Sequence, residues 1–175
     1  MKVLFLTILI TSLLLISSNT GFAQYKVGKN TAGVLLGIGG GGLNGTGAVP
    51  ISAEINFLNF EKNIQAGVFV SYSSSSEDFG FGDQWKYTYI IIAAQGNYHF
   101  LPGDKVDPFA GLSLGYDAAS VSYNGPHGNF YSSPSVGGFF FSAQAGLNYW
   151  FNEKIAAQLR VGYYPFVAIG VTFAI

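Results

Sequence analysis

Large hydrophobic side chains alternate with small or polar ones over most of the chain beyond residue 24. The C-terminal segment Phe166–Ile175 shows the pattern most clearly. Every second residue from Val167 to Ile175 is large and apolar, and the residues between them are alanine, glycine or threonine. Successive side chains of a β-strand point to opposite faces, so this period of two predicts a strand with one hydrophobic face and one small or polar face.

Eight segments carry this alternation, and each predicts one strand. The pattern is less regular in the first, fourth and fifth segments, so their ends are less sharply defined. The predicted strands are Thr31–Gly39, Val49–Phe57, Ile64–Tyr72, Trp85–Phe100, Pro108–Val121, Phe139–Phe151, Ile155–Tyr163 and Phe166–Ile175.

The segments that join the predicted strands alternate in length. Short polar turns are expected at residues 59–63, 101–107 and 152–154, and long loops rich in Gly, Ser and Asn at 39–48, 73–84 and 122–135. Short turns on one side and long loops on the other are typical of outer-membrane barrels. We therefore predict an all-β fold, an eight-stranded antiparallel up-and-down transmembrane β-barrel.

Aromatic residues cluster near the predicted strand ends. Because amphipathic rings favour membrane interfaces, two aromatic girdles are expected. A soluble sandwich would place charged residues on the second face of each strand, whereas here that face carries almost no Lys or Glu. The girdle residues are Phe57, Phe100, Tyr149 and Phe151 near the short turns, and Tyr72, Trp85, Tyr87, Tyr116 and Tyr163 near the long loops.

The composition favours the same fold. Only 10% of the 175 residues are charged, whereas soluble domains carry about 25%. No run of about 18 apolar residues occurs beyond the N-terminus, which argues against helical membrane spans. The net charge of −1 gives no indication of nucleic-acid binding, and the absence of cysteine excludes disulfides and thiolate metal sites. We expect no cofactor and no bound metal.

Residues 1–23 have the three parts of a secretory signal peptide. Lys2 supplies the positive charge, residues 3–16 form the apolar core, and Gly21 and Ala23 are the small residues before a cleavage site. The mature chain would then begin at Gln24, and residues 24–175 would form the barrel domain. An uncleaved membrane anchor is the alternative, and the apolar core is short for that role.

Four motifs resemble small outer-membrane barrels of the OmpA/OmpX type, in the outer-membrane protein β-barrel domain family. They are PFAGLSLGY at residues 108–116, AQAGLNYWF at 143–151, QLRVGY at 158–163 and IGVTFAI at 169–175. The resemblance implies a location in the outer membrane of a Gram-negative bacterium, contact with membrane lipids and lipopolysaccharide, and insertion by the barrel-assembly machinery. It also favours a monomer.

Glu54 and Arg160 are the only charged residues that the pattern places on inward faces in the middle of strands. The interior of an eight-stranded barrel is just wide enough to be filled by side chains, and a buried charge needs a partner. We therefore predict one interior polar network that contains both residues and has a structural role. A gated ion path and a catalytic pair are the alternatives. The other candidate members are Gln65, Gln95, Asn97, Gln144 and Gln158.

The long loops are the expected interaction surface, because loops on a rigid scaffold commonly carry recognition. The favoured function is structural or adhesive, directed at an unknown extracellular ligand or surface. A small passive pore is the alternative, and a lipid-A-modifying enzyme is the lesser one. Lipid-A deacylases use a His-x-Ser arrangement, which fails here because Leu101 lies two residues after His99. The loop candidates are Glu77, Asp78, Asp83, Trp85 and His127.

Overall fold

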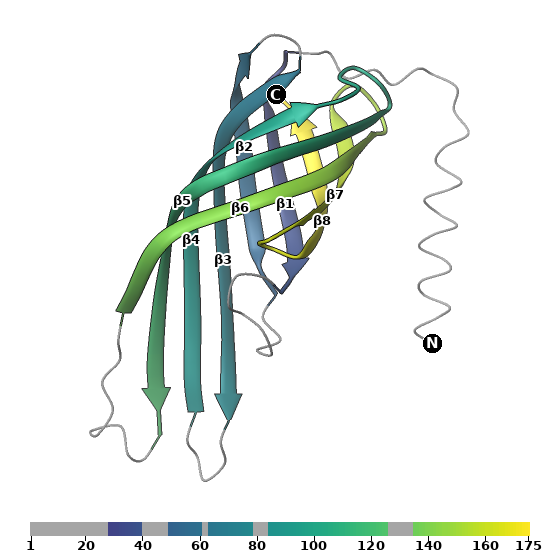
Figure 1. Cartoon of the computed structure of the whole chain (residues 1–175). Helices are drawn as coiled ribbons and strands as arrows, with labels where there is room; N and C mark the ends of the chain where they lie inside the picture. The colour runs from purple at the N-terminus through teal and green to yellow at the C-terminus, as the bar shows by residue number, and fades with distance from the viewer. Residues whose placement is uncertain (1–27, 40–48, 61–62, 79–83, 126–134) are drawn as a thin grey trace, which may run out of the picture.

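The computed structural model describes residues 28–39, 49–60, 63–78, 84–125 and 135–175. Within these residues, eight antiparallel strands form one closed barrel (Figure 1). No helix in the described part of the chain is long and apolar enough to cross a membrane. The predicted signal peptide, residues 1–23, lies outside the described residues. The strands are β1 (Thr31–Ile38), β2 (Ile51–Phe60), β3 (Ile64–Asp78), β4 (Gln84–His99), β5 (Val106–Asn124), β6 (Ser135–Trp150), β7 (Ile155–Gly162) and β8 (Val167–Ala174).

The barrel closes by pairing its first strand with its last. Each strand is hydrogen-bonded to its neighbour in the sequence, and β1 pairs with β8 from Thr31 opposite Ala174 to Ile38 opposite Val167. Closure pairs the two edges that an open sheet would leave exposed, and strands can stand in lipid only when every backbone group is paired in this way. The predicted eight-stranded up-and-down barrel is therefore confirmed.

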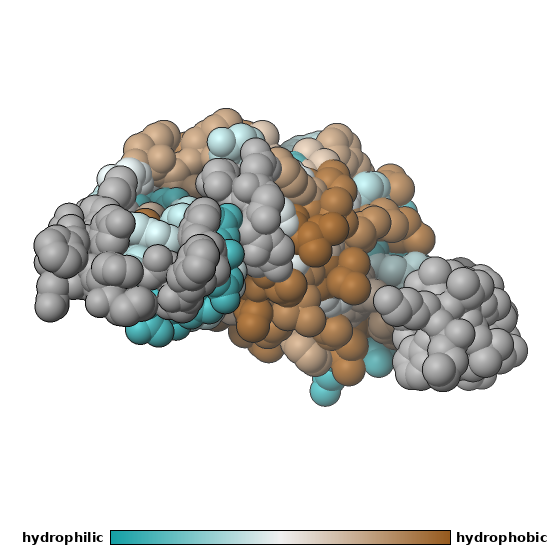
Figure 2. Space-filling model, turned by 90° about the horizontal axis from the view of Figure 1, so that it is seen from below, coloured by the Kyte–Doolittle hydropathy of each residue, from teal (hydrophilic) through white to brown (hydrophobic). Residues whose placement is uncertain are grey.

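Side chains alternate between the barrel interior and its outer surface, as the period of two predicts. On β2, Ser52, Glu54 and Asn56 are at most 6% exposed, whereas Ile51 and Ile55 are 53% and 41% exposed. The same alternation continues along β7 and β8. The exposed apolar side chains form a hydrophobic flank, which is brown in Figure 2.

One irregularity in the sheet depends on a glycine. The pairing of β2 with β3 shifts in register between Asn56 and Leu58. Gly67 pairs with Asn56 beside this shift, and a Cβ atom at Gly67 would overlap the backbone carbonyl of Ile55. Only a residue without a side chain allows the two backbones to approach so closely.

The strands differ in length, which divides the molecule into two regions. β1, β2, β7 and β8 have 8 to 10 residues, whereas β3, β4, β5 and β6 have 15 to 19. β3, β4 and β5 therefore continue past the ends of the short strands, at the bottom of Figure 1. We call this end of the barrel the loop end, and the opposite end, with the short turns, the turn end.

The predicted extent of two long loops is wrong. The segments at residues 73–84 and 122–135 were expected to be loops, but β3 continues to Asp78, β4 starts at Gln84 and β5 continues to Asn124. Their serine-rich composition is typical of loops. The serines of β3 nevertheless pair with residues 86–89 of β4, where aromatic residues favour strand structure.

Candidate functional site

The barrel interior holds a charged pair at mid-height. The Arg160 guanidinium on β7 donates to the Glu54 carboxylate on β2, and both side chains are at most 2% exposed. Gln95 on β4 donates from Nε2 to Oε2 of Glu54 at 3.0 Å, and Gln158 on β7 donates from Nε2 to Oε1 at 3.1 Å. The carboxylate thus accepts from three side chains, which compensates for its removal from water.

Aromatic rings provide the second part of the environment of Arg160. The guanidinium carbon lies 5.4 Å from the ring centroid of Phe69 and 5.9 Å from that of Phe109. Both distances are within the range of a cation–π interaction. Nε and Nη1 of Arg160 have no hydrogen-bond partner, so the ring faces and one carboxylate balance this cation.

Three residues that the sequence analysis did not select extend this network. Asn56 accepts from Nε2 of Gln95 at 2.8 Å and donates to the hydroxyl of Thr31 at 3.1 Å. The Thr172 hydroxyl donates to Oε1 of Gln158 at 3.0 Å. The alternation along β2 places Asn56 on the inward face, but its contact with Gln95 depends on how far neighbouring strands are staggered.

The other predicted members lie apart from the charged pair. Gln144 on β6 donates to Oδ1 of Asn97 at 2.9 Å and accepts from the Ser113 hydroxyl at 2.9 Å. Gln65 donates to Oδ1 of Asn59 at 2.9 Å near the turn end. In the part of the chain that the structure describes, no hydrogen bond joins Gln144 or Asn97 to Glu54, so the predicted single network is divided.

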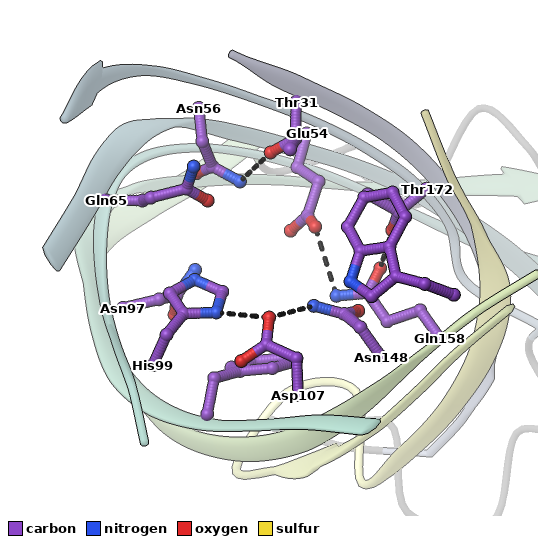
Figure 3. A pocket seen from close by; sticks show the side chains of 12 residues that line it. Thr31, Glu54, Asn56, Gln65, Asn97, His99, Asp107, Asn148, Gln158 and Thr172 are labelled. Atoms are coloured by element: carbon purple, nitrogen blue, oxygen red, sulfur yellow. Dashed lines mark hydrogen bonds and ion pairs between the residues drawn. The ribbon is translucent and has the colours of Figure 1, made fainter. Parts of the chain in front are cut away.

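A second acidic residue is buried near the turn end. His99 Nδ1 lies 2.7 Å from Oδ2 of Asp107, and Asn148 donates to the same oxygen at 3.5 Å (Figure 3). The sequence analysis placed Asp107 in a turn, but β5 begins at Val106, and Asp107 is 0% exposed. Asp107 is therefore an inward charged residue at the start of β5, outside the mid-strand positions for which only Glu54 and Arg160 were predicted.

Side chains fill the interior between these polar groups. The cavity lined by the residues of Figure 3 leaves a volume of about 10 Å³ for the centre of a water molecule, which is room for about one water. At two inward glycines the space is filled: the Phe109 ring lies over Gly146 and the Pro165 ring over Gly37. Neighbouring rings therefore occupy the space beside these two glycines.

Tyr164 closes the barrel axis towards the loop end. It lies between β7 and β8, is 3% exposed and packs edge-to-face on Phe140, with ring centroids 5.9 Å apart. Its hydroxyl is 3.4 Å from the Ser71 hydroxyl and 3.2 Å from that of Ser73. Tyr164 therefore marks the boundary between the filled barrel and the region beyond it.

The outer surface of the long strands changes at the same height. The last large apolar residues on their outward faces are Tyr72, Ile90, Tyr116 and Phe139, which are 44–78% exposed. The next outward residues towards the loop end are Ser74, Thr88, Ala118 and Gly137, which are small or polar. The hydrophobic flank therefore ends here, and Ser73–Asp78, Gln84–Tyr89 and Asp117–Asn124 form what we call the protruding sheet.

Two predicted girdle residues belong to the protruding sheet. Trp85 and Tyr87 are half-buried and share a strand face with Tyr89, which packs on the interior cluster around Tyr164. The Trp85 ring lies 5.3 Å from that of Tyr123 on β5, edge-to-face. The prediction that Trp85 and Tyr87 contact lipid is therefore wrong, because they project on the same side as the barrel axis.

The predicted loop candidates have different positions. Glu77 and Asp78 lie in β3 and Trp85 in β4, so none of these three is in a loop. Asp83 and His127 lie outside the described residues. Their proposed role in recognition stays a prediction.

An additional acidic residue lies on the inward face of the protruding sheet. Asp117 is half-buried, and its Oδ1 has no hydrogen-bond partner. Burial raises the pKa of Asp117 above its usual value. Burial also raises the pKa of Tyr89, and the nearby Asp117 carboxylate raises it further. Asp117 lies in the middle of β5, on the same face as the inward Ser113 four residues earlier, so the expectation that Glu54 and Arg160 are the only inward charged residues at mid-strand is wrong.

The described residues offer no obvious set of ligands for a metal ion. Among the described residues, no three His, Cys, Asp or Glu side chains are grouped so that they would hold a metal ion. The two polar clusters of the barrel interior and the aromatic side of the protruding sheet are therefore the features to be explained.

Comparison with known proteins supports the fold. The model of a family described as "Outer membrane protein beta-barrel domain" matches residues 8–169. The N-terminal β-barrel domain of OprF from Pseudomonas aeruginosa is similar in structure, with a TM-score of 0.53 and 14% identity over 87% of this chain and 99% of that one. No curated protein sequence matches the chain significantly.

Two further solved structures have lower TM-scores. The attachment invasion locus protein Ail of Yersinia pestis, in complex with the heparin analogue sucrose octasulfate, has a TM-score of 0.47 and 13% identity over 83% of this chain and 92% of that one. Neisserial surface protein A has a TM-score of 0.47 and 17% identity over 84% of this chain and 95% of that one.

Proposed function

Because this chain belongs to the outer-membrane protein β-barrel domain family, we propose that it is a surface-interaction barrel that presents its protruding sheet outside the outer membrane. The observation that carries this proposal is the continuation of β3, β4 and β5 past the hydrophobic flank. A paired sheet holds its side chains in fixed positions, and such rigidity lowers the entropic cost of binding a partner.

The filled interior supports a structural role for the barrel itself. Glu54 and Arg160 neutralise each other at mid-height, and Tyr164 packs across the axis towards the loop end. Aqueous lumens belong to barrels with more strands. A passive pore is therefore the weaker proposal, and a lipid-A-modifying activity has no candidate His-x-Ser arrangement at His99.

We also propose how the protein is exported and inserted into the outer membrane. Residues 1–23 would direct export and be removed before Gln24, and the barrel-assembly machinery would insert the mature chain as a monomer among lipids and lipopolysaccharide. N-terminal sequencing of the protein from an outer-membrane fraction tests the cleavage site. A sequence that begins at Met1 would contradict it.

Shortening the protruding sheet tests the surface-interaction role. Ser73 and Tyr89 pair directly, so an Asn-Gly turn in place of residues 74–88 would close the β3–β4 hairpin at the edge of the hydrophobic flank. Cells that display the full chain are expected to adhere to surfaces coated with extracellular proteins, and cells with the short hairpin are not. A heat-dependent gel shift shows that both variants fold.

Conductance measurements distinguish the pore alternative. The refolded chain should leave a planar bilayer electrically quiet, since the interior is filled. Regular conductance steps from the folded protein, combined with adhesion that survives hairpin removal, would favour the pore over a surface interaction.

A further inference from the structure

The inward side of the protruding sheet carries four aromatic residues in a small area. Trp85 pairs with Tyr123, Tyr87 with Val121 and Tyr89 with Ala119 across β4 and β5. No register shift interrupts these pairs, so all of these side chains project on the same side. We call Trp85, Tyr87, Tyr89 and Tyr123 the aromatic face.

The charged residues on this side of the described sheet are acidic. Asp117 lies at its base, where it pairs with Ile91, and Glu77 lies at its tip, where it pairs with Trp85. The nearest lysine, Lys86, is on the opposite side of β4, because it alternates with Trp85 and Tyr87. The side therefore combines negative charge with the electron-rich faces of aromatic rings.

Asp117 is half-buried, and one of its two carboxylate oxygens has no hydrogen-bond partner. Its Oδ1 is inaccessible to water and has no partner. The Asp117 carboxylate lies close enough to Tyr89 to raise the pKa of that hydroxyl, and Tyr89 carries no positive charge. Gly138 pairs with Asp117 from β6, and the space where its side chain would lie is open. Because Asp117 is only half-buried, a donor from another molecule would reach its carboxylate on the exposed side rather than at Oδ1.

The dimensions of the aromatic face fit a short extended chain. Trp85 and Tyr89 are four residues apart on β4, which corresponds to about 13 Å along the strand. Asp117, opposite Ile91, extends the face by one further inward position. A single ammonium group would contact only part of this area, whereas an extended peptide of about four residues would cover it.

We propose that the aromatic face binds an extended, arginine-containing segment of another protein, with one guanidinium on the Asp117 carboxylate and another on the rings of β4. Guanidinium groups stack on aromatic rings and pair with carboxylates, often in two-point contact. The charge of this side is complementary to such a segment. The inference rests on the proposed surface interaction and adds the chemistry of the partner.

Peptide binding to the refolded full-length barrel tests the inference. The probe is a fluorescent peptide Gly-Arg-Gly-Arg-Gly-Arg-Gly with blocked ends, and its control carries citrulline, which has the same shape without charge. The protein is held in an uncharged polyoxyethylene detergent, because a quaternary-ammonium head group would compete for the rings. Fluorescence anisotropy should show saturable binding of the arginine peptide, at least about tenfold tighter than that of the citrulline peptide.

Two variants and one control locate the binding surface. Asp117→Asn and Tyr87→Leu should each weaken binding of the arginine peptide by about tenfold. Glu153→Gln removes a carboxylate from an exposed turn at the opposite end and should leave the affinity within about twofold. A heat-dependent gel shift confirms that each variant is folded.

Three results would overturn the inference. Equal weakening by Asp117→Asn and Glu153→Gln would indicate diffuse attraction to negative charge. Equal binding of the citrulline peptide would indicate recognition of a neutral ligand. Absence of binding to the folded wild-type barrel would remove the assigned partner chemistry, while adhesion that still depends on the β3–β4 hairpin would leave the proposed surface role intact.

Discussion

The barrel and the protruding sheet are built from the same strands, but their two faces have opposite polarity. In the barrel, β4 exposes Ile92 on the outside and buries Gln95 and Asn97 inside. In the protruding sheet, the same strand exposes Lys86 on the outside and places Trp85 and Tyr87 on the inward side. Side chains of β4 keep alternating between the two faces along the whole strand, because the pairing of β4 with β5 has no register shift.

The difference shows that the surroundings, rather than the strand, decide which face is apolar. Lipid surrounds the barrel, so its outward residues are hydrophobic and its narrow interior holds paired polar groups. Beyond the hydrophobic flank the outward face meets water and becomes polar, and the inward face collects aromatic rings. Four predictions test this division, from the largest expected effect to the smallest.

Breaking the interior ion pair should have the largest effect. Arg160→Met leaves Glu54 buried with a negative charge and only two glutamines to compensate it, and should destabilise the barrel by about 3–5 kcal/mol. The double variant Arg160→Met with Glu54→Gln removes both charges and should recover most of this loss. Urea unfolding of the refolded barrel in lipid vesicles measures both. Equal losses in the single and double variants would show that the pair is not coupled.

A positive charge on the outward face should cost far more stability in the barrel than in the protruding sheet. Leu112→Arg places a guanidinium near the middle of the hydrophobic flank and should cost about 2–4 kcal/mol in a bilayer. Ser120→Arg makes the same change on the outward face of the protruding sheet, where the cost should be within about 0.5 kcal/mol. Vesicle-based unfolding compares the two directly. Similar costs at both positions would mean that the membrane boundary does not lie at Tyr116.

Removing the Tyr164 hydroxyl should have a smaller effect at the boundary between the regions. Tyr164→Phe keeps the edge-to-face contact with Phe140 but leaves Ser73 without that partner, at a cost of about 1 kcal/mol. Because the ring still fills the axis, planar bilayers should stay quiet with this variant. The matched Tyr164→Ala variant removes the ring as well, and conductance from Tyr164→Ala alone would locate the closure at this ring.

The smallest effect is a pH-dependent gain from Asp117→Asn. Burial raises the pKa of Asp117, so the folded state binds more protons than the unfolded state between the usual pKa of 3.8 and the raised one. Stability therefore falls as pH rises through this window and stays lower above it. The Asn variant should be slightly more stable than the wild type at neutral pH, with a difference that shrinks as the pH falls through this window towards 3.8.

The Asp117 experiment also distinguishes binding from a structural role. A carboxylate that weakens the fold but strengthens peptide binding has a function that compensates for its cost in stability. A variant that gains stability and binds the peptide as well as the wild type would identify Asp117 as an unpaired structural residue.

The sequence alone predicted the fold for a simple physical reason. Alternate side chains of a strand face different surroundings, so lipid on one side and a narrow interior on the other leave a period of two in the chain. The same period identified Glu54 and Arg160 as inward charges. Because the pattern placed no other charged residue on an inward face at mid-strand, the two were expected to pair.

Other parts of the site could not be predicted from the pattern. Alternation assigns a face to each residue but not the stagger between strands, so it did not show that Asn97 meets Gln144 rather than Glu54. Asp107 and the serine-rich end of β3 have compositions typical of turns and loops. Their strand structure depends on pairing with partners far along the chain.

The sequence by itself determined the number of strands, the faces of most of them and the side of the barrel on which the short turns lie, because these follow from local periodicity and turn composition. Only the tertiary structure decided where the long strands end, how the interior polar groups are grouped and which way the rings of Trp85 and Tyr87 point. These features depend on strand stagger and on unequal strand lengths, which arise when all eight strands close into one barrel.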